Sequence, residues 1–171
     1  MVAQPKPKQT GIGEIIDAII ARLVAASAVG DPGQVLVVAR DKNPPHAVAD
    51  KDVIIRVRQN VIKPGWFTGG GRLATTLTRY LTIYARSTYE IDKGQTDLEW
   101  IRQHDAFEAS ILSALLDWIP YDTSHNSLLT TPMVMDTTSL PPEKEKDNSV
   151  WGDSLATYSV TYLPTIDMSF I

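Results

Sequence analysis

Histidine and carboxylate side chains in one stretch of the sequence have the spacing to bind a metal ion. His104, which precedes Asp105, lies four residues before Glu108, so an imidazole and a carboxylate would share one face of a helix. A zinc site takes at least three protein ligands, and the spacing identifies no third one. Solvated polar residues on a helix surface show the same pattern. We therefore predict no metal site and no bound cofactor.

Other catalytic patterns find no support in the sequence. A serine nucleophile needs a partner base and an elbow such as Gly-x-Ser-x-Gly, and the chain has no such motif. The glycines 69–71 precede Arg72 rather than Lys and Ser or Thr, so a hairpin tip is a better interpretation than a phosphate-binding loop. The chain has no cysteine, which excludes disulfides, thiolate zinc sites and cysteine nucleophiles. We predict that the protein is not an enzyme.

Aromatic and arginine side chains instead suggest a surface that binds protein. Trp66 and Phe67 lie between glycines in a stretch, 63–71, that has the composition of a loop, and aromatic residues are enriched at interface hot spots. The following stretch, 72–88, alternates as a strand, with tyrosines and threonines on one face. The candidate interaction residues are Trp66, Phe67, Arg72, Arg79, Tyr80 and Tyr84. The alternatives are that the two loop aromatics cover the protein's own core and that the strand face is simply solvated.

Two helices and several strands must position these residues. Apolar residues at helical spacing predict a first helix over about 12–29 that ends at Gly30. A capping box, Thr96 to Glu99, predicts a second helix that runs to about Trp118. β-branched and alternating runs predict strands at 34–40, 53–61, 72–88 and 155–163, and a short one at 133–135.

The order of these elements predicts an α+β fold, a mostly antiparallel sheet with two α-helices packed on one face. The consecutive strands 53–61 and 72–88 should form an antiparallel hairpin, and a strand as long as the second is expected to bend or carry a bulge. The threonine and tyrosine face of 72–88 should then look outward. Residues 1–10 are expected to form a flexible arm, and 11–171 a single domain with an irregular insertion at 120–150.

Composition restricts the classes of function further. The 171 residues include 16 Lys and Arg against 20 Asp and Glu, which gives a net charge of −4. A dedicated nucleic-acid-binding surface normally shows as a basic excess, so we expect no sequence-specific contact with DNA or RNA.

The most apolar stretch, 12–29, is long enough to raise the question of a membrane helix. Glu14, Asp17 and Arg22 interrupt it, and each would be costly in hydrocarbon. The small residues 26–28 imitate a signal-peptide cleavage site, but Arg22 lies inside what would be the apolar region. We expect an amphipathic helix and no membrane association.

Three segments carry a resemblance to a known family. They are RLATTLTRYLTIYARST at 72–88, HDAFEASILSALLDW at 104–118 and WGDSLATYSVTYL at 151–163. With the helix and strands before them, this order resembles the tail terminator proteins of long-tailed bacteriophages, also called tail completion or tail-to-head joining proteins. The resemblance covers about residues 12–163 and lies in architecture and length rather than in a signature motif. The chain departs from it in the long segment 120–150 and the extended hairpin 59–71.

The resemblance implies a structural virion protein. Six subunits would form a ring at the head-proximal end of the tail tube, end tube polymerisation and provide the surface that joins the head. Its partners would be further copies of itself, the tail tube protein and a head-completion or connector protein, with DNA passing through the lumen without sequence recognition. Assembly would take place in the host cytoplasm. The family offers no catalytic residue or cofactor to carry over.

Several interpretations remain open at the level of sequence. As a hypothesis, the strands 53–61 and 72–88 and their connection form the surface between subunits or toward the tube, with Trp66 and Phe67 as anchors. The chain would otherwise be another neck or tail component, such as a head-completion or minor tail protein. An alternative of a different class is a soluble α+β domain that binds a small ligand or acts as an enzyme.

Overall fold

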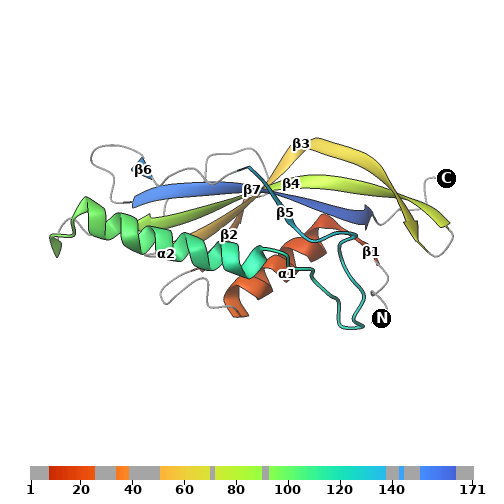
Figure 1. The fold of residues 1–171 in the computed structure, drawn as a ribbon, viewed down its shortest axis with the longest axis horizontal. Helices are drawn as coiled ribbons and strands as arrows, with labels where there is room; N and C mark the ends of the chain where they lie inside the picture. Colours follow the sequence, from red (N-terminus) through yellow and green to blue (C-terminus); the bar gives the residue numbers. More distant parts are fainter. Residues whose placement is uncertain are drawn as a thin grey trace.

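A computed structural model describes residues 8–25, 34–38, 51–69, 72–89, 93–137, 143–144 and 151–164 of the chain (Figure 1). Its helices and strands are, in chain order, β1 (Gln9–Thr10), α1 (Ile12–Ala25), β2 (Gln34–Val38), β3 (Lys51–Gly69), β4 (Arg72–Thr88), α2 (Asp97–Leu115), β5 (Val134–Thr137), β6 (Glu143–Lys144) and β7 (Trp151–Pro164). Both helices lie on the same side of the sheet (Figure 1). The predicted α+β class is therefore confirmed.

The sheet is mixed but mostly antiparallel. Its strand order is β1-β7-β4-β3-β2, with β5 and β6 also paired to β7. The pairs β3–β4 and β4–β7 are antiparallel and long, while β2–β3 and β1–β7 are parallel. The predicted hairpin of consecutive strands is thus confirmed, and the last described strand, β7, lies between β1 and β4.

The hydrophobic core lies between the sheet and the two helices. Alternation along each strand directs one set of apolar side chains toward the helices. The core strands contribute Val53, Ile55, Val57, Leu81, Ile83, Ala85, Ala156, Tyr158 and Val160, and the helices contribute Ile15, Ile19, Leu23, Phe107, Ile111 and Leu115. Each large aliphatic side chain buried in this way contributes about 1.5–3 kcal/mol relative to exposure. This burial fixes which face of the sheet the helices cover.

Local sequence signals explain where α2 begins and ends. The Glu99 backbone N donates to Thr96 Oγ1 at 3.3 Å, and the Thr96 backbone N donates to Glu99 Oε2 at 2.8 Å, which is the predicted capping box. The helix ends at Leu115, three residues before the predicted end, because Leu116 has an extended backbone and Asp117 a φ of 55°. The predicted last residues of the first helix, and Gly30 after it, lie outside the described residues.

The prediction of a loop at 63–71 is wrong. Strand β3 continues to Gly69, and Trp66 and Phe67 pair with Thr75 and Ala74 across the hairpin. Gly65 allows the two strands to approach closely, because a Cβ on this residue would lie 2.7 Å from Thr76 Oγ1.

The bend or bulge expected in the second strand of the hairpin, β4, occurs instead in its partner strand, β3. The register of β3 shifts between Val57, which pairs with Leu81, and Ile62, which pairs with Arg79. The extra residues belong to β3, so that strand takes up the bend while β4 keeps a continuous ladder with β7.

Part of the segment expected to be a flexible arm belongs to the sheet, which corrects its boundary. Gln9 and Thr10 pair in parallel with Leu163 and Pro164, and Thr10 is completely buried. The Lys8 backbone N donates to the Ser127 carbonyl at 2.9 Å. The segment is ordered because its backbone hydrogen bonds have partners in distant parts of the chain. Residues 1–7 lie outside the described residues.

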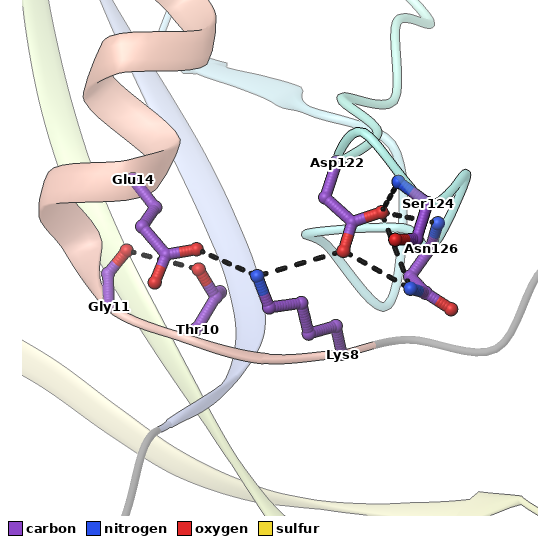
Figure 2. A network of polar contacts seen from close by, with 7 residues as sticks. All are labelled: Lys8, Thr10, Gly11, Glu14, Asp122, Ser124 and Asn126. Atoms are coloured by element: carbon purple, nitrogen blue, oxygen red, sulfur yellow. Dashed lines mark hydrogen bonds and ion pairs between the residues drawn. The ribbon is translucent and has the colours of Figure 1, made fainter.

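A network of polar contacts holds this N-terminal strand to the turn after α2 (Figure 2). Lys8 Nζ lies 3.3 Å from Glu14 Oε2 and 3.6 Å from Asp122 Oδ2. Asp122 Oδ1 in turn accepts hydrogen bonds from the backbone N of Ser124 and Asn126 at 2.9 and 2.8 Å. These bonds hold the pKa of the Asp122 carboxyl below its usual value, with a smaller contribution from the charge of Lys8. The start of the predicted irregular insertion therefore contains a turn at 122–126 that these hydrogen bonds hold in place. The strand β5, at Val134–Thr137, follows it and lies close to the strand predicted at 133–135.

Candidate functional site

The face of the sheet turned away from the helices, called the outer face below, carries polar side chains from three strands. Cross-strand register aligns Arg56 of β3 with Thr82 of β4, and Thr82 with Thr157 of β7. The next row joins Tyr84 to Leu155. The tyrosine and threonine face expected to look outward does face away from the helices, but Thr82 and Thr157 are buried within the chain.

A hollow of about 480 Å³ opens on this outer face. Its lining is mostly polar and contains two guanidinium groups, three hydroxyls and one aliphatic side chain: Arg56, Arg58, Thr82, Tyr84, Leu155 and Thr157. The Arg56 Nη1 atom donates to the Tyr84 hydroxyl at 3.4 Å, so the tyrosine helps to position that arginine. Hydroxyls and guanidinium groups gathered in a concave site are suited to bind carboxylate or phosphate oxygens.

The two arginines of the hollow differ in their surroundings. Arg58 is exposed, and among the described residues no ion pair or hydrogen bond joins it to another side chain. Arg56 is half-buried and contacts Tyr84. In the row beyond Tyr84, Asp52 lies directly opposite Arg86, and both are buried. A carboxylate residue is therefore paired in register with the buried Arg86, while Arg58 gives the lining of the hollow an exposed positive charge.

The structure brings together two of the six predicted interaction residues. Tyr84 lines the hollow, and Tyr80 lies on the same face, buried opposite Ser159. Arg79 belongs to the other face of β4, between Ile62 and Val160.

Trp66, Phe67 and Arg72 lie in the far part of the hairpin, and their side chains are outside the described residues. Sequence reasoning missed Arg56 and Arg58. Their alternation with Val57 was visible, but their proximity to Thr82 and Thr157 depends on register.

The far part of the β3–β4 hairpin, residues 65–69 and 72–76, is called the hairpin ribbon below. Strand β7 pairs with β4 only from Leu77 onward, and β2 pairs with β3 only over 52–56. Within the described strands the ribbon is therefore two-stranded, and it extends beyond both helices (Figure 1). A two-stranded ribbon is marginally stable alone, and its open edges can template pairing with another chain.

His104 occupies the core rather than the helix surface, where the sequence pattern suggested it. It is completely buried, with Nδ1 2.7 Å from Ser87 Oγ and Nε2 2.9 Å from Ser154 Oγ. Trp100 and Phe107 flank its ring on α2, with ring centroids 5.2 and 6.4 Å away. The histidine therefore joins α2 to both β4 and β7.

The cavity next to Ser154, a hydrogen-bond partner of this histidine, is small. The nearby cavity, lined by Glu108, Ser154 and Tyr158, measures about 10 Å³, which is close to the volume for one water molecule. Burial raises the pKa of Glu108, and it raises the pKa of Tyr158 to about 12. Within the described ranges, no group of three or more His, Cys, Asp or Glu residues could hold a metal ion. We interpret this cluster as a structural network.

Comparison with known proteins adds no identification. No protein-family model matches the chain, and no curated protein matches it.

The two helices of the described part were also compared with the requirements of a membrane span. Neither is both long enough and apolar enough to cross a bilayer.

Proposed function

We propose that this protein is a structural virion protein of the tail terminator type. Six copies form a ring at the head-proximal end of a phage tail tube, where the ring ends tube polymerisation and provides the head-joining surface. The sequence resemblance supports this proposal, and the helices and strands on which the resemblance rests are all present in the fold. Its partners are further copies of the chain, the tail tube protein and a head-completion or connector protein.

The hairpin ribbon is the observation that carries the proposal. Residues 65–69 and 72–76 pair with each other and with no other described strand. A ribbon of this kind gains stability when another chain covers its face or extends its edge. Trp66 and Phe67 lie within it and are the residue types that anchor protein interfaces. This architecture favours a protein that works by assembling with others.

The charge of the chain agrees with a conduit for DNA. The net charge of −4 gives passing DNA no general attraction to the subunit. A lumen rich in lysine and arginine would hold the phosphates through counterion release and slow the passage. DNA therefore passes through the ring without sequence readout.

The test begins with the purified chain and then adds the tail tube protein encoded with it. We expect closed rings of six subunits by native mass spectrometry and negative-stain microscopy, either free or on tube ends. The double variant Trp66→Ala, Phe67→Ala should lose ring formation and tube capping. Tyr121→Ala, which removes an exposed aromatic side chain outside the ribbon, is the matched control and should behave as wild type.

Two results would count against the proposal. A stable dimer without a pore, with no binding to tube ends, would remove the terminator function. Rings on a different neck component, with a stoichiometry other than six, would assign the chain to another position in the virion. Normal capping by the Trp66→Ala, Phe67→Ala variant would remove the ribbon from the contact surface and leave the terminator function to other surfaces.

A further inference from the structure

The hollow on the outer face has the chemistry of a receptor for one acidic group. Arg58 lines it and is exposed, and the hydroxyls of Thr82, Tyr84 and Thr157 also belong to its lining. Two arginines are too few for a polyanion such as DNA, which is bound by an extended basic surface. They are well suited to one carboxylate, which a guanidinium group binds through two parallel hydrogen bonds.

The outward side of α2 presents such a carboxylate. Leu98, Ile101 and Asp105 are spaced three and four residues apart and lie on one exposed side of the helix, called the outer stripe of α2 below. Leu98 is 56% and Ile101 36% exposed, so both offer apolar surface to a partner. Within the described residues the carboxylate of Asp105 makes no ion pair and no side-chain hydrogen bond. An apolar strip beside an exposed carboxylate is suited to a partner that offers both arginine and an apolar contact, such as Leu155 in the hollow.

The two surfaces lie on opposite sides of the same subunit, because α2 packs on one face of the sheet and the hollow opens on the other. They therefore cannot meet within one chain. Between two copies they form a head-to-tail contact, which repeats from subunit to subunit and closes into a ring when the rotation allows. We infer that the hollow receives Asp105 and the outer stripe of α2 of a second copy of this chain. This inference rests on the proposed ring and names the contact that builds it.

Cysteine crosslinking in the full chain tests the contact directly, because the natural sequence contains no cysteine. Ser159→Cys places a thiol beside the hollow, opposite Tyr80, and Ala109→Cys places one on the exposed side of α2, one turn after Asp105. Both substitutions leave Arg58 and Asp105 in place. With a short bismaleimide reagent, a head-to-tail contact gives a ladder of dimers, trimers and larger species. A symmetric contact through one surface alone would stop at dimers.

Charge reversal in this two-cysteine background then identifies the pair. Arg58→Glu alone and Asp105→Arg alone should each lower the yield of trimers and larger species by about tenfold, because like charges would face each other. Arg58→Glu combined with Asp105→Arg should recover the ladder. The matched control combines Arg58→Glu with Asp17→Arg, which reverses an exposed carboxylate on α1 and should recover nothing. Unchanged circular dichroism and thermal melting would show that each variant is folded.

The outcomes separate this inference from the proposed function. The inference would be overturned if no ladder forms, or if Arg58→Glu does not change the yield of the ladder, even if rings still form on tube ends. Recovery by Asp17→Arg as well would also overturn it, because the effect would then be net charge alone. Stabilisation of the chain by citrate or inorganic phosphate, without a ladder, would assign the hollow to a small anion. A charge-dependent ladder without tube capping would support the contact and count against the terminator function.

Discussion

His104 and Ser154 are fifty residues apart in the chain, yet the histidine Nε2 lies 2.9 Å from the serine hydroxyl. The other ring nitrogen contacts Ser87 Oγ at 2.7 Å, so one side chain joins α2 to two strands. In a buried site both nitrogens and both hydroxyls need partners, because an unsatisfied polar group costs about 1–3 kcal/mol. This relationship makes the network a structural requirement of the helix–sheet packing.

Replacing this histidine should therefore destabilise the fold. His104→Ala leaves a cavity and two buried hydroxyls without their partner, and we expect a loss of about 2–5 kcal/mol in the free energy of unfolding. Denaturant titration followed by circular dichroism measures it. His125→Asn is the control, because His125 is exposed and has a φ of 62°, a conformation that asparagine tolerates. Equal stability of the two variants would contradict the structural role of His104.

Glu108 should make stability fall as the pH rises through the acid range. Burial raises its pKa above the ordinary value of 4.5, the charge of Asp105 adds to this, and a hydrogen bond with Ser154 opposes it. Because the pKa of Glu108 is raised in the folded state, its contribution to the free energy of unfolding is complete below about pH 4.5. That contribution is lost as the pH rises through the pKa of the folded state. Glu108→Gln should therefore be more stable than wild type at neutral pH.

Thermal melts of both proteins at a series of pH values between about 3 and 8 measure this difference in stability. The advantage of Glu108→Gln should vanish at the acid end, where the wild-type carboxyl is protonated. Asp117→Asn, an exposed residue in a left-handed turn, is the control and should show no such advantage. A Glu108→Gln variant that is less stable at neutral pH would contradict the prediction.

Asp122 should have the opposite pH dependence. Hydrogen bonds from Asn126 lower its pKa below 3.8, with further contributions from Ser124 and Lys8. The stability that it contributes is present above that value and is lost as the pH falls through the folded pKa. Asp122→Asn should be less stable than wild type at neutral pH, and the two proteins should converge in acid.

Hydrogen exchange adds a local measurement of the same contact. The amide protons of Ser124 and Asn126, which donate to Asp122, should exchange faster in Asp122→Asn. Asp17→Asn, on the exposed side of α1, should leave them unchanged. Protection of these amides that does not change in Asp122→Asn would mean that the turn is held by other contacts.

Gly65 should be required for the hairpin ribbon. A methyl group there would start 2.7 Å from Thr76 Oγ1, so Gly65→Ala must push the two strands apart or displace the threonine. We expect a loss of about 1–3 kcal/mol and faster amide exchange over 65–69. The combination of Gly65→Ala with Thr76→Ala relieves the contact and should recover most of that loss. Failure of this rescue would mean that the backbone conformation, rather than the contact, requires glycine.

Local patterns were sufficient to predict much of the fold. The capping box at Thr96, the alternation of the two hairpin strands and the apolar face of the first helix depend on neighbours within a few residues, and the structure confirms them. The extension of β3 through 63–69 could not be predicted, because proline and glycine are typical of loops and only pairing with β4 makes them a strand.

The candidate site was less accessible to sequence reasoning. Tyr80 and Tyr84 were found because they alternate within one strand. The hollow also needs Arg56 from β3 and Thr157 from β7, which meet only through the register of three strands. His104 was misjudged for the same reason, since Ser87 and Ser154 come from distant strands. Long-range register is the information that local patterns lack.

The position of β7 has a consequence for how the protein is made. This strand lies between β4 on one side and β1, β5 and β6 on the other, and it is synthesised after every other described element. Until residues 151–164 leave the ribosome, β1 and β4 have no partner in β7. Pairing of β1 and β4 with β7 is thus postponed until residues 151–164 have been synthesised. A nascent chain cannot present a finished outer face before then, because Leu155 and Thr157 of the hollow belong to β7.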